Sequence, residues 1–278
     1  MSKLLSADFT RLRKSKEFWL CAAAILSLSV IIIYNGAQSA SSMAERGFVR
    51  HLDDYYFQLA PYVDAITAVF ISLFLGVEYS DGTIKNKLIA GHTRKNIYLA
   101  NFLTCLTGSI VIHTLWFIGG LPGLYLIGSF EMGSSGAIAY FFVSVGFAAA
   151  FSAIFVLIGT LSQNRSHTVV FLLFLWWAIT FTASGINDRL QEPEFNGGNM
   201  AMIDGCFVMT EETPNPLYLS GSIRTTFEWL YRFLPSGQAV AMSNTEITIP
   251  ALDIALSILV TIIVTAIGIQ LFRKKDIK

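Results

Sequence analysis

The chain has 278 residues, of which 54% are hydrophobic and only 14% are charged. A water-soluble domain usually carries a charge on about a quarter of its residues, so this composition excludes an ordinary soluble protein and predicts a membrane protein. The 19 basic residues are balanced by 19 acidic residues, so there is no overall positive field to attract nucleic acid.

Residues 1–16 are predicted to form a helix that lies in the membrane surface. Leu5, Phe9 and Leu12 recur at helical spacing and would share one face. The lysines and arginines around them can reach water or anionic lipid headgroups. The alternative is a disordered basic anchor that only sets the topology.

Six apolar stretches have about the 20 residues that a helix needs to cross the hydrocarbon core. The predicted fold class is therefore all-α, as a single polytopic membrane domain. The first stretch, with the basic residues before it, resembles a cleavable signal peptide, but it exceeds the usual length of about 7–15 residues and is expected to be a retained span. The third contains Gly119, Gly120 and Pro122, which predict a break near its outer end. The predicted spans run near 18–36, 59–77, 98–122, 137–161, 168–186 and 250–272.

The basic residues predict the orientation of these spans. If the N-terminus is cytoplasmic, the cytoplasmic segments hold all but five of the 19 lysines and arginines, as the positive-inside rule requires. An even number of spans returns the C-terminus to the same side, so both termini are expected in the cytoplasm. The five exceptions are Arg46, Arg50, Arg189, Arg224 and Arg232.

The cytoplasmic loop 78–97, between the second and third spans, contains the signals of a short helix. Ser80 or Asp81 can cap its start, and Gly91 can end it. Thr93 can cap the following helix, which continues into the third span.

The short helix has the pattern of a docking element. Ile84 and Leu88 lie one turn apart and would form an apolar ridge, with Lys85 and Lys87 as a basic rim. The alternative is a loop that only sets the topology and whose apolar residues dip into the membrane surface.

The stretch from Glu78 to Tyr98 resembles the inner loop of the type-two membrane subunits of ATP-binding-cassette exporters (ABC-2). These bacterial permeases have six spans and a surface helix at the N-terminus, and their corresponding short helix, the coupling helix, sits in a groove of a separate ATPase subunit. The resemblance implies an exporter in a bacterial cytoplasmic membrane, an ATPase partner that holds ATP and Mg²⁺, and a second permease subunit in a homodimer or heterodimer. It assigns coupling to Glu78, Ser80, Asp81, Gly82, Thr83, Ile84, Lys85, Lys87, Leu88 and Gly91.

The chain shows no motif for chemistry of its own. It lacks GxxxxGK[ST] and even a Gly-Lys pair, so it has no phosphate-binding loop and an ATP-driven mechanism needs a partner chain. It also lacks HExxH and GxSxG, so we predict no catalytic, cofactor-binding or metal-binding residues, and an intramembrane enzyme is a weak alternative. An ion-coupled transporter without an ATPase is the other alternative, although carboxylates near the midplane and inverted repeats are not evident.

Three ionisable residues within the predicted spans are candidates for the transport path. Asp64 lies near the outer end of the second span, His113 lies in the third, and Asp253 opens the sixth. Ionisable groups in hydrocarbon are costly and are therefore functional candidates. Asp64 and Asp253 are expected to stay hydrated near the outer surface, and a lone histidine is more often a packing residue.

The extracellular segment 187–249 is long enough to have structure of its own. Its first half is polar and rich in turn residues, whereas Phe227, Leu230, Tyr231 and Leu234 in the second half predict an amphipathic helix at the outer interface. The resemblance implies short re-entrant helices here that would cap the outer exit of the path; a surface helix without a gating role is the alternative. The sequence leaves peptides, lipids, small toxic molecules and ions open as substrates.

Overall fold

The computed structural model describes all residues except 163–164, 197–199, 204–205, 210–211 and 276–278. The described chain is almost entirely helical, with six helices long and apolar enough to cross a membrane. They are α2 (Lys16–Ala44), α4 (Ala60–Ser80), α6 (Arg94–Gly120), α8 (Gly133–Leu161), α9 (Arg165–Gln191) and α12 (Pro250–Lys274). The prediction of an all-α polytopic membrane protein is confirmed.

The third span ends where glycines and a proline predicted a break. α6 stops at Gly120, and the short helix α7 (Gly123–Leu126) follows after Pro122. A side chain at position 120 would lie 2.3 Å from the ring of Tyr56, which ends the short helix α3 (Asp53–Tyr56). Only a glycine therefore lets these two segments approach so closely.

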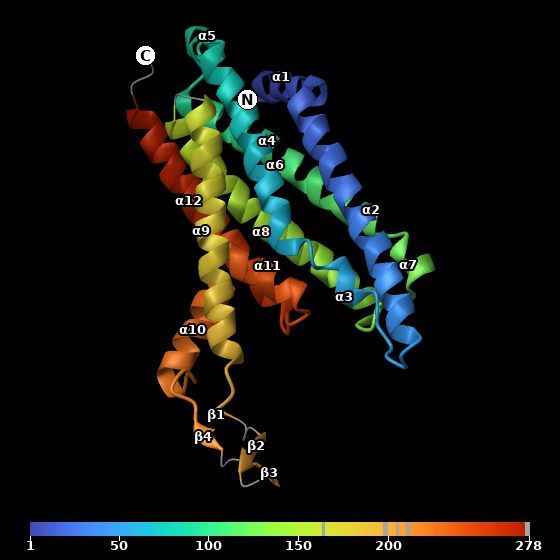
Figure 1. The fold of residues 1–278 in the computed structure, drawn as a ribbon. Coiled ribbons are helices and arrows are strands. Elements are labelled where there is room, and N and C mark those ends of the chain that lie inside the picture. The colour runs from blue at the N-terminus through green and yellow to red at the C-terminus, as the bar shows by residue number, and fades with distance from the viewer. Residues whose placement is uncertain (163–164, 197–199, 204–205, 210–211, 276–278) are drawn as a thin grey trace.

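Both chain ends and two short helices gather at one end of the bundle (Figure 1). The helices are α1 (Ser2–Lys14) and α5 (Thr83–Ile89). The basic last turn of α12, with Arg273 and Lys274, lies at the same end. We call it the basic end.

The central helices of the bundle are α4 and α8. α8 packs on α4, α6 and α12, and α4 also packs on α9. In their most apolar windows, 67% and 61% of the residues of the α4 and α8 spans are buried, against 17% for α9 and 22% for α12. The exposed apolar side chains of α9 and α12 are therefore available to lipid or to another membrane subunit.

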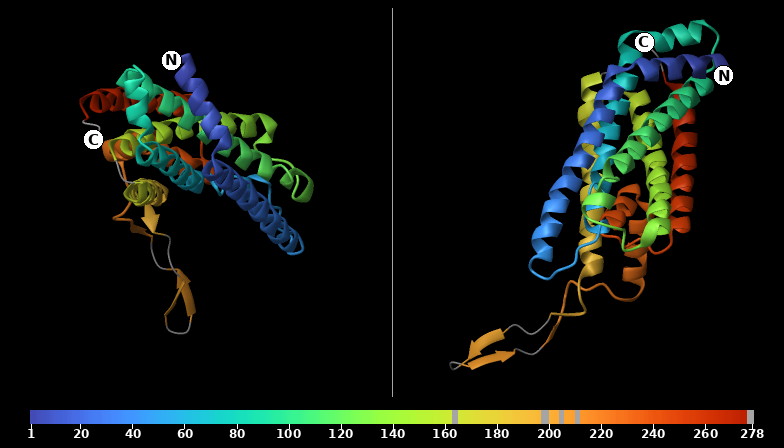
Figure 2. Two further views of the ribbon diagram at one scale, coloured as in Figure 1. Left: turned by 90° about the horizontal axis from the view of Figure 1, so that it is seen from above. Right: turned by 90° about the vertical axis from the view of Figure 1, so that its right-hand side faces the viewer.

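The segment after α9 forms two small antiparallel sheets and two helices at the opposite end. β1 (Phe195–Asn196) pairs with β4 (Thr213–Pro214), and β2 (Met200–Ile203) pairs with β3 (Cys206–Met209). The strands project away from the helical bundle (Figure 2). They were not predicted from the sequence, which showed only polar and turn-forming residues there.

Helix α10 (Gly221–Phe233) matches the predicted amphipathic helix. The chain then turns at Leu234 into α11 (Pro235–Ser243), which packs against α4, α8 and α9. All residues from Pro235 to Val240 are buried. α11 is thus a short helix inserted back into the bundle.

Candidate functional site

Helix α5 is bounded by two glycines with positive φ angles. Gly82 precedes it with a φ of 65°, and Gly91 follows it with a φ of 86°. The amide of Gly91 donates to the carbonyl of Leu88 (2.9 Å), which closes the end of the helix as predicted.

Thr93 caps the next helix, α6, because its side chain accepts a hydrogen bond from the amide of Asn96 (3.3 Å). The prediction that Ser80 or Asp81 caps α5 is wrong. Gly82 occupies that position, and the Ser80 hydroxyl instead donates to the carbonyl of Val77 (3.1 Å).

The side of α5 that faces solvent is not the predicted one. Ile84 is only 1% exposed, and Leu88 packs partly buried against the same core, so they do not form a surface ridge. Lys87 is buried as well and cannot belong to a basic rim. The exposed face of α5 instead carries Lys85, Asn86 and Ile89, followed by the exposed C-cap Ala90.

Lys87 is the centre of a buried group of side chains that we call the ion cluster: Asp8, Arg11, Glu78, Lys87 and Asn101. The Lys87 ammonium donates to Asp8 Oδ1 at 2.8 Å and also pairs with Glu78. Arg11 reaches the same Glu78 oxygen at 2.8 Å, and the Asn101 amide donates to the other oxygen at 2.7 Å. The cluster joins α1, α4, α5 and α6, and its two positive and two negative charges cancel.

Burial governs the electrostatics of this cluster. Burial raises the pKa of Asp8, and the negative charge of Glu78 raises it further. Lys87 and Arg11 lower it. The Arg11 guanidinium lies over the ring of Phe74, 3.8 Å from its centre. Since an unpaired charge at this depth is costly, the four charged groups hold one another in place.

Glu78 and Lys87 were predicted as coupling residues, but Asp8, Arg11 and Asn101 were missed. A signal for Asp8 was present, because it lies between Leu4 and Leu12 on one helical face. These three residues are the buried ones of α1. An aspartate on the buried face of an amphipathic helix predicts a basic partner.

The last turn of α12 is also tied to the basic end. Lys275 donates to the carbonyls of Thr160 (2.7 Å) and Leu161 (3.1 Å) at the end of α8, and its partial burial lowers its pKa. Arg94, at the start of α6, donates to the carbonyl of Phe272 (3.3 Å). The ends of α6, α8 and α12 are thus fixed relative to one another.

The structure brings together two of the three candidates for the transport path. His113 Nε2 lies 3.4 Å from Asp64 Oδ1, and the two side chains are 0% and 1% exposed. Neither side chain makes a hydrogen bond with any other described residue, and Trp116 and Phe147 pack around the histidine. The expectation that Asp64 stays hydrated is therefore wrong.

Asp253 lies elsewhere, on the wall of a pocket at the opposite end, and is 4% exposed. It too is more buried than predicted. Within the described parts of the chain, no group of three His, Cys, Asp or Glu side chains is placed to hold a metal ion.

Comparison with known proteins identifies the family. No curated protein sequence matches the chain. The sequence model of a family described as ABC-2 family transporter protein matches residues 4–183, which contain most of α1, the ion cluster, α5 and four complete spans. Because this match covers well over half of the chain, the protein belongs to the ABC-2 family of transporter proteins.

Proposed function

We propose that the chain is the permease subunit of an ATP-driven exporter and that α5 docks on a separate ATPase subunit. The observation that carries this proposal is the two-sided environment of α5. One side is fixed to the spans by the ion cluster, whereas the other side carries Ile89, which is 84% exposed. On a short helix that is anchored to the spans, Ile89 beside Lys85 and Asn86 offers an apolar contact that a groove of a partner could receive.

The ion cluster gives α5 a means of moving the spans. Glu78 is in α4, Asn101 is in α6, and Lys87 of α5 contacts them both. A displacement of α5 would therefore move two membrane helices and α1 together. ATP binding would draw two ATPase subunits together and shift a pair of permease subunits between inward-open and outward-open states.

This proposal places the basic end in the cytoplasm, as the positive-inside rule predicts. α5 then faces the compartment that contains ATP and Mg²⁺, which the partner subunit would bind. The chain itself would carry out no covalent chemistry. A second permease subunit, identical or different, would complete the path, and the exposed apolar faces of α9 and α12 offer surface for it.

Loss of ATPase binding on substitution of Ile89 tests the docking surface. The chain is purified from its native membrane in mild detergent, with and without Ile89→Asp. We expect an ATPase subunit to co-purify with the wild type and to be lost from the variant, because a carboxylate at an apolar contact is costly to desolvate. Ile84→Asp is unsuitable, since Ile84 is buried and its replacement would disrupt folding.

The matched control is Ile223→Asp on α10, because Ile223 is also well exposed, at 59%, but lies at the opposite end. This variant should retain the ATPase subunit. The docking assignment would be overturned if no ATPase accompanied the wild type, or if Ile89→Asp retained it as fully as Ile223→Asp did.

The buried Asp64–His113 pair is the observation that favours the ion-coupled alternative, because such a pair can exchange a proton. Transport in reconstituted vesicles separates the two mechanisms. We expect export that requires the ATPase and ATP and that persists in Asp64→Asn. Transport driven by an imposed pH gradient without ATP, and abolished in Asp64→Asn, would replace the proposed mechanism.

A further inference from the structure

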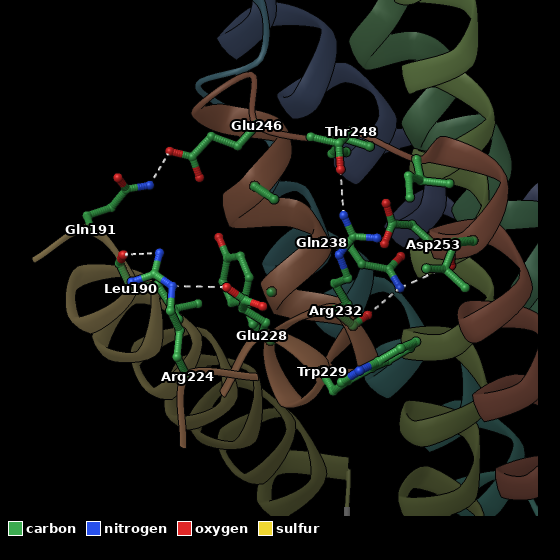
Figure 3. A pocket seen from close by; sticks show the side chains of 16 residues that line it. Leu190, Gln191, Arg224, Glu228, Trp229, Arg232, Gln238, Glu246, Thr248 and Asp253 are labelled. Atoms are coloured by element: carbon green, nitrogen blue, oxygen red, sulfur yellow. Dashed lines mark hydrogen bonds and ion pairs between the residues drawn. The ribbon is translucent and has the colours of Figure 1, made fainter. Parts of the chain in front are cut away.

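A pocket of about 650 Å³ lies beside α10, at the end of the molecule opposite α5 (Figure 1). Figure 3 shows the side chains that line it. It lies between the last turn of α9, the helices α10 and α11, and the start of α12. Its lining combines apolar side chains with two arginines and three carboxylates. The pocket is outside the ion cluster and does not include the Asp64–His113 pair.

The floor of the pocket is preorganised by Gln238. Its amide nitrogen donates to the carbonyls of Arg232 (2.9 Å) and Asp253 (3.1 Å), and its oxygen accepts from the Ser257 hydroxyl (2.7 Å). Gly237 lets α10 and α11 approach, since a Cβ there would lie 1.9 Å from the carbonyl oxygen of Tyr231. The two sides of the pocket are therefore held together before any ligand arrives.

One of the two arginines is already neutralised. Arg224 forms an ion pair with Glu228 (3.1 Å) and donates to the carbonyl of Leu190 (3.2 Å). This pair lies on the rim and contributes no net charge.

The remaining three charged groups form no direct ion pair with any described residue. Arg232 donates to the Thr248 hydroxyl (2.6 Å), and Glu246 accepts from the Gln191 amide (2.6 Å). The Asp253 carboxylate has no hydrogen bond or ion pair among the described residues, although its side chain is only 4% exposed. Arg232 lies beside Asp253 and its positive charge acts on the carboxylate, but the two form no direct ion pair (Figure 3). Together these groups leave the pocket with a net charge of one negative unit.

We propose that this pocket binds an amphipathic organic cation, with its ammonium or guanidinium group at Asp253. A nearly buried carboxylate without a donor is costly, and a ligand ammonium can supply up to three donors. The apolar part of the ligand packs on Leu252 and on Trp229, which is 54% exposed and can also contact the cation with its ring. An anion would be repelled by the net negative charge of the pocket, and a neutral apolar molecule would leave Asp253 without a donor.

This binding is a property of the chain alone and does not depend on an ATPase partner. The test of ligand binding to the pocket therefore gives the same result whether or not α5 docks on an ATPase subunit.

Calorimetry on the full chain in nanodiscs of zwitterionic lipid tests the site, with empty nanodiscs subtracted. The probes are octylammonium, octanoate and octanol, which share the apolar chain and differ in charge. Octylammonium should bind saturably and the other two should not. Asp253→Asn should weaken the binding of octylammonium about tenfold or more, because it removes a charge-assisted contact.

The matched control is Asp188→Asn, which alters an exposed aspartate of α9 outside the pocket and should bind like the wild type. Trp229→Ala changes an exposed side chain, so folding is not at risk, and it should weaken binding several-fold. The proposal is overturned if octanoate binds as tightly as octylammonium, if octylammonium only partitions into the lipid, or if Trp229→Ala and a folded Asp253→Asn both bind like the wild type.

Discussion

The two ends of the molecule use the same kinds of side chain in opposite ways. At the basic end, Lys87 and Arg11 balance the charges of Asp8 and Glu78 within the ion cluster. At the other end, Asp253 and Arg232 border a cavity of about 650 Å³ without forming an ion pair. Charges that satisfy one another fix helices in place, whereas charges without ionic partners are available to a ligand.

The largest expected effect comes from removing the cation of the ion cluster. Lys87→Met would leave two buried carboxylates with only Arg11 to balance them, which should lower the free energy of unfolding by about 3–5 kcal/mol. Thermal unfolding in detergent measures the loss. Lys85→Met is the control, since Lys85 is exposed and its replacement should change stability by less than about 0.5 kcal/mol. Equal effects of the two substitutions would show that the cluster does not stabilise the basic end.

A smaller loss is expected at the floor of the pocket. Gly237→Ala places a Cβ 1.9 Å from a backbone oxygen, so α10 and α11 must separate, at a cost of about 1–3 kcal/mol. Gly185→Ala in α9 is the matched change, because nothing lies within 4 Å of its Cβ, and alanine should be neutral or stabilising there. If thermal unfolding showed the same result for the two variants, the close contact between α10 and α11 would not hold the pocket together.

The smallest expected effect is that of Asp8→Asn at neutral pH. Burial already raises the pKa of Asp8, so the folded chain binds its proton more tightly than the unfolded chain does. The contribution of Asp8 to stability is thus greatest below its unfolded pKa of about 3.9 and is lost as the pH rises through its folded pKa. Asp8→Asn removes this dependence and should cost less than about 1.5 kcal/mol at pH 7.

The measurement is the difference in the free energy of unfolding between the wild type and Asp8→Asn, from below about pH 3.9 to pH 7. The advantage of the wild type should shrink as the pH rises. An advantage that grew with pH would mean that Lys87 and Arg11 outweigh the burial of the carboxylate, and the assigned direction of the pKa would be wrong.

Much of the fold follows from local patterns in the sequence. The six spans are readable from the lengths of the apolar runs, and the break after Gly120 follows from its glycines and proline. Gly91 marks the end of α5, and Thr93 marks the start of α6. Each of these signals acts within a few residues of its own position.

The sites depend on contacts between distant segments, which local patterns do not contain. A helix as short as α5 presents Ile84 and Ile89 on different sides, and nothing in its spacing says which side meets the spans. The ion cluster needs Asp8 to reach Lys87, and the pocket needs α11 to turn back into the bundle. For that reason Ile84 was predicted to lie on an exposed ridge, whereas the structure buries it, although the helix itself was placed correctly.

Cysteine labelling at position 89 tests the central claim, that the exposed face of α5 lies in the cytoplasm and receives an ATPase subunit. Ile89→Cys is introduced together with Cys206→Ser, so that position 89 is the site of labelling. The two remaining cysteines, Cys21 and Cys105, are buried. A membrane-impermeant thiol reagent should leave intact cells unlabelled, label inside-out vesicles stripped of the ATPase, and fail to label vesicles that retain it. Labelling of intact cells at position 89, or equal labelling with and without the ATPase subunit, would contradict the account.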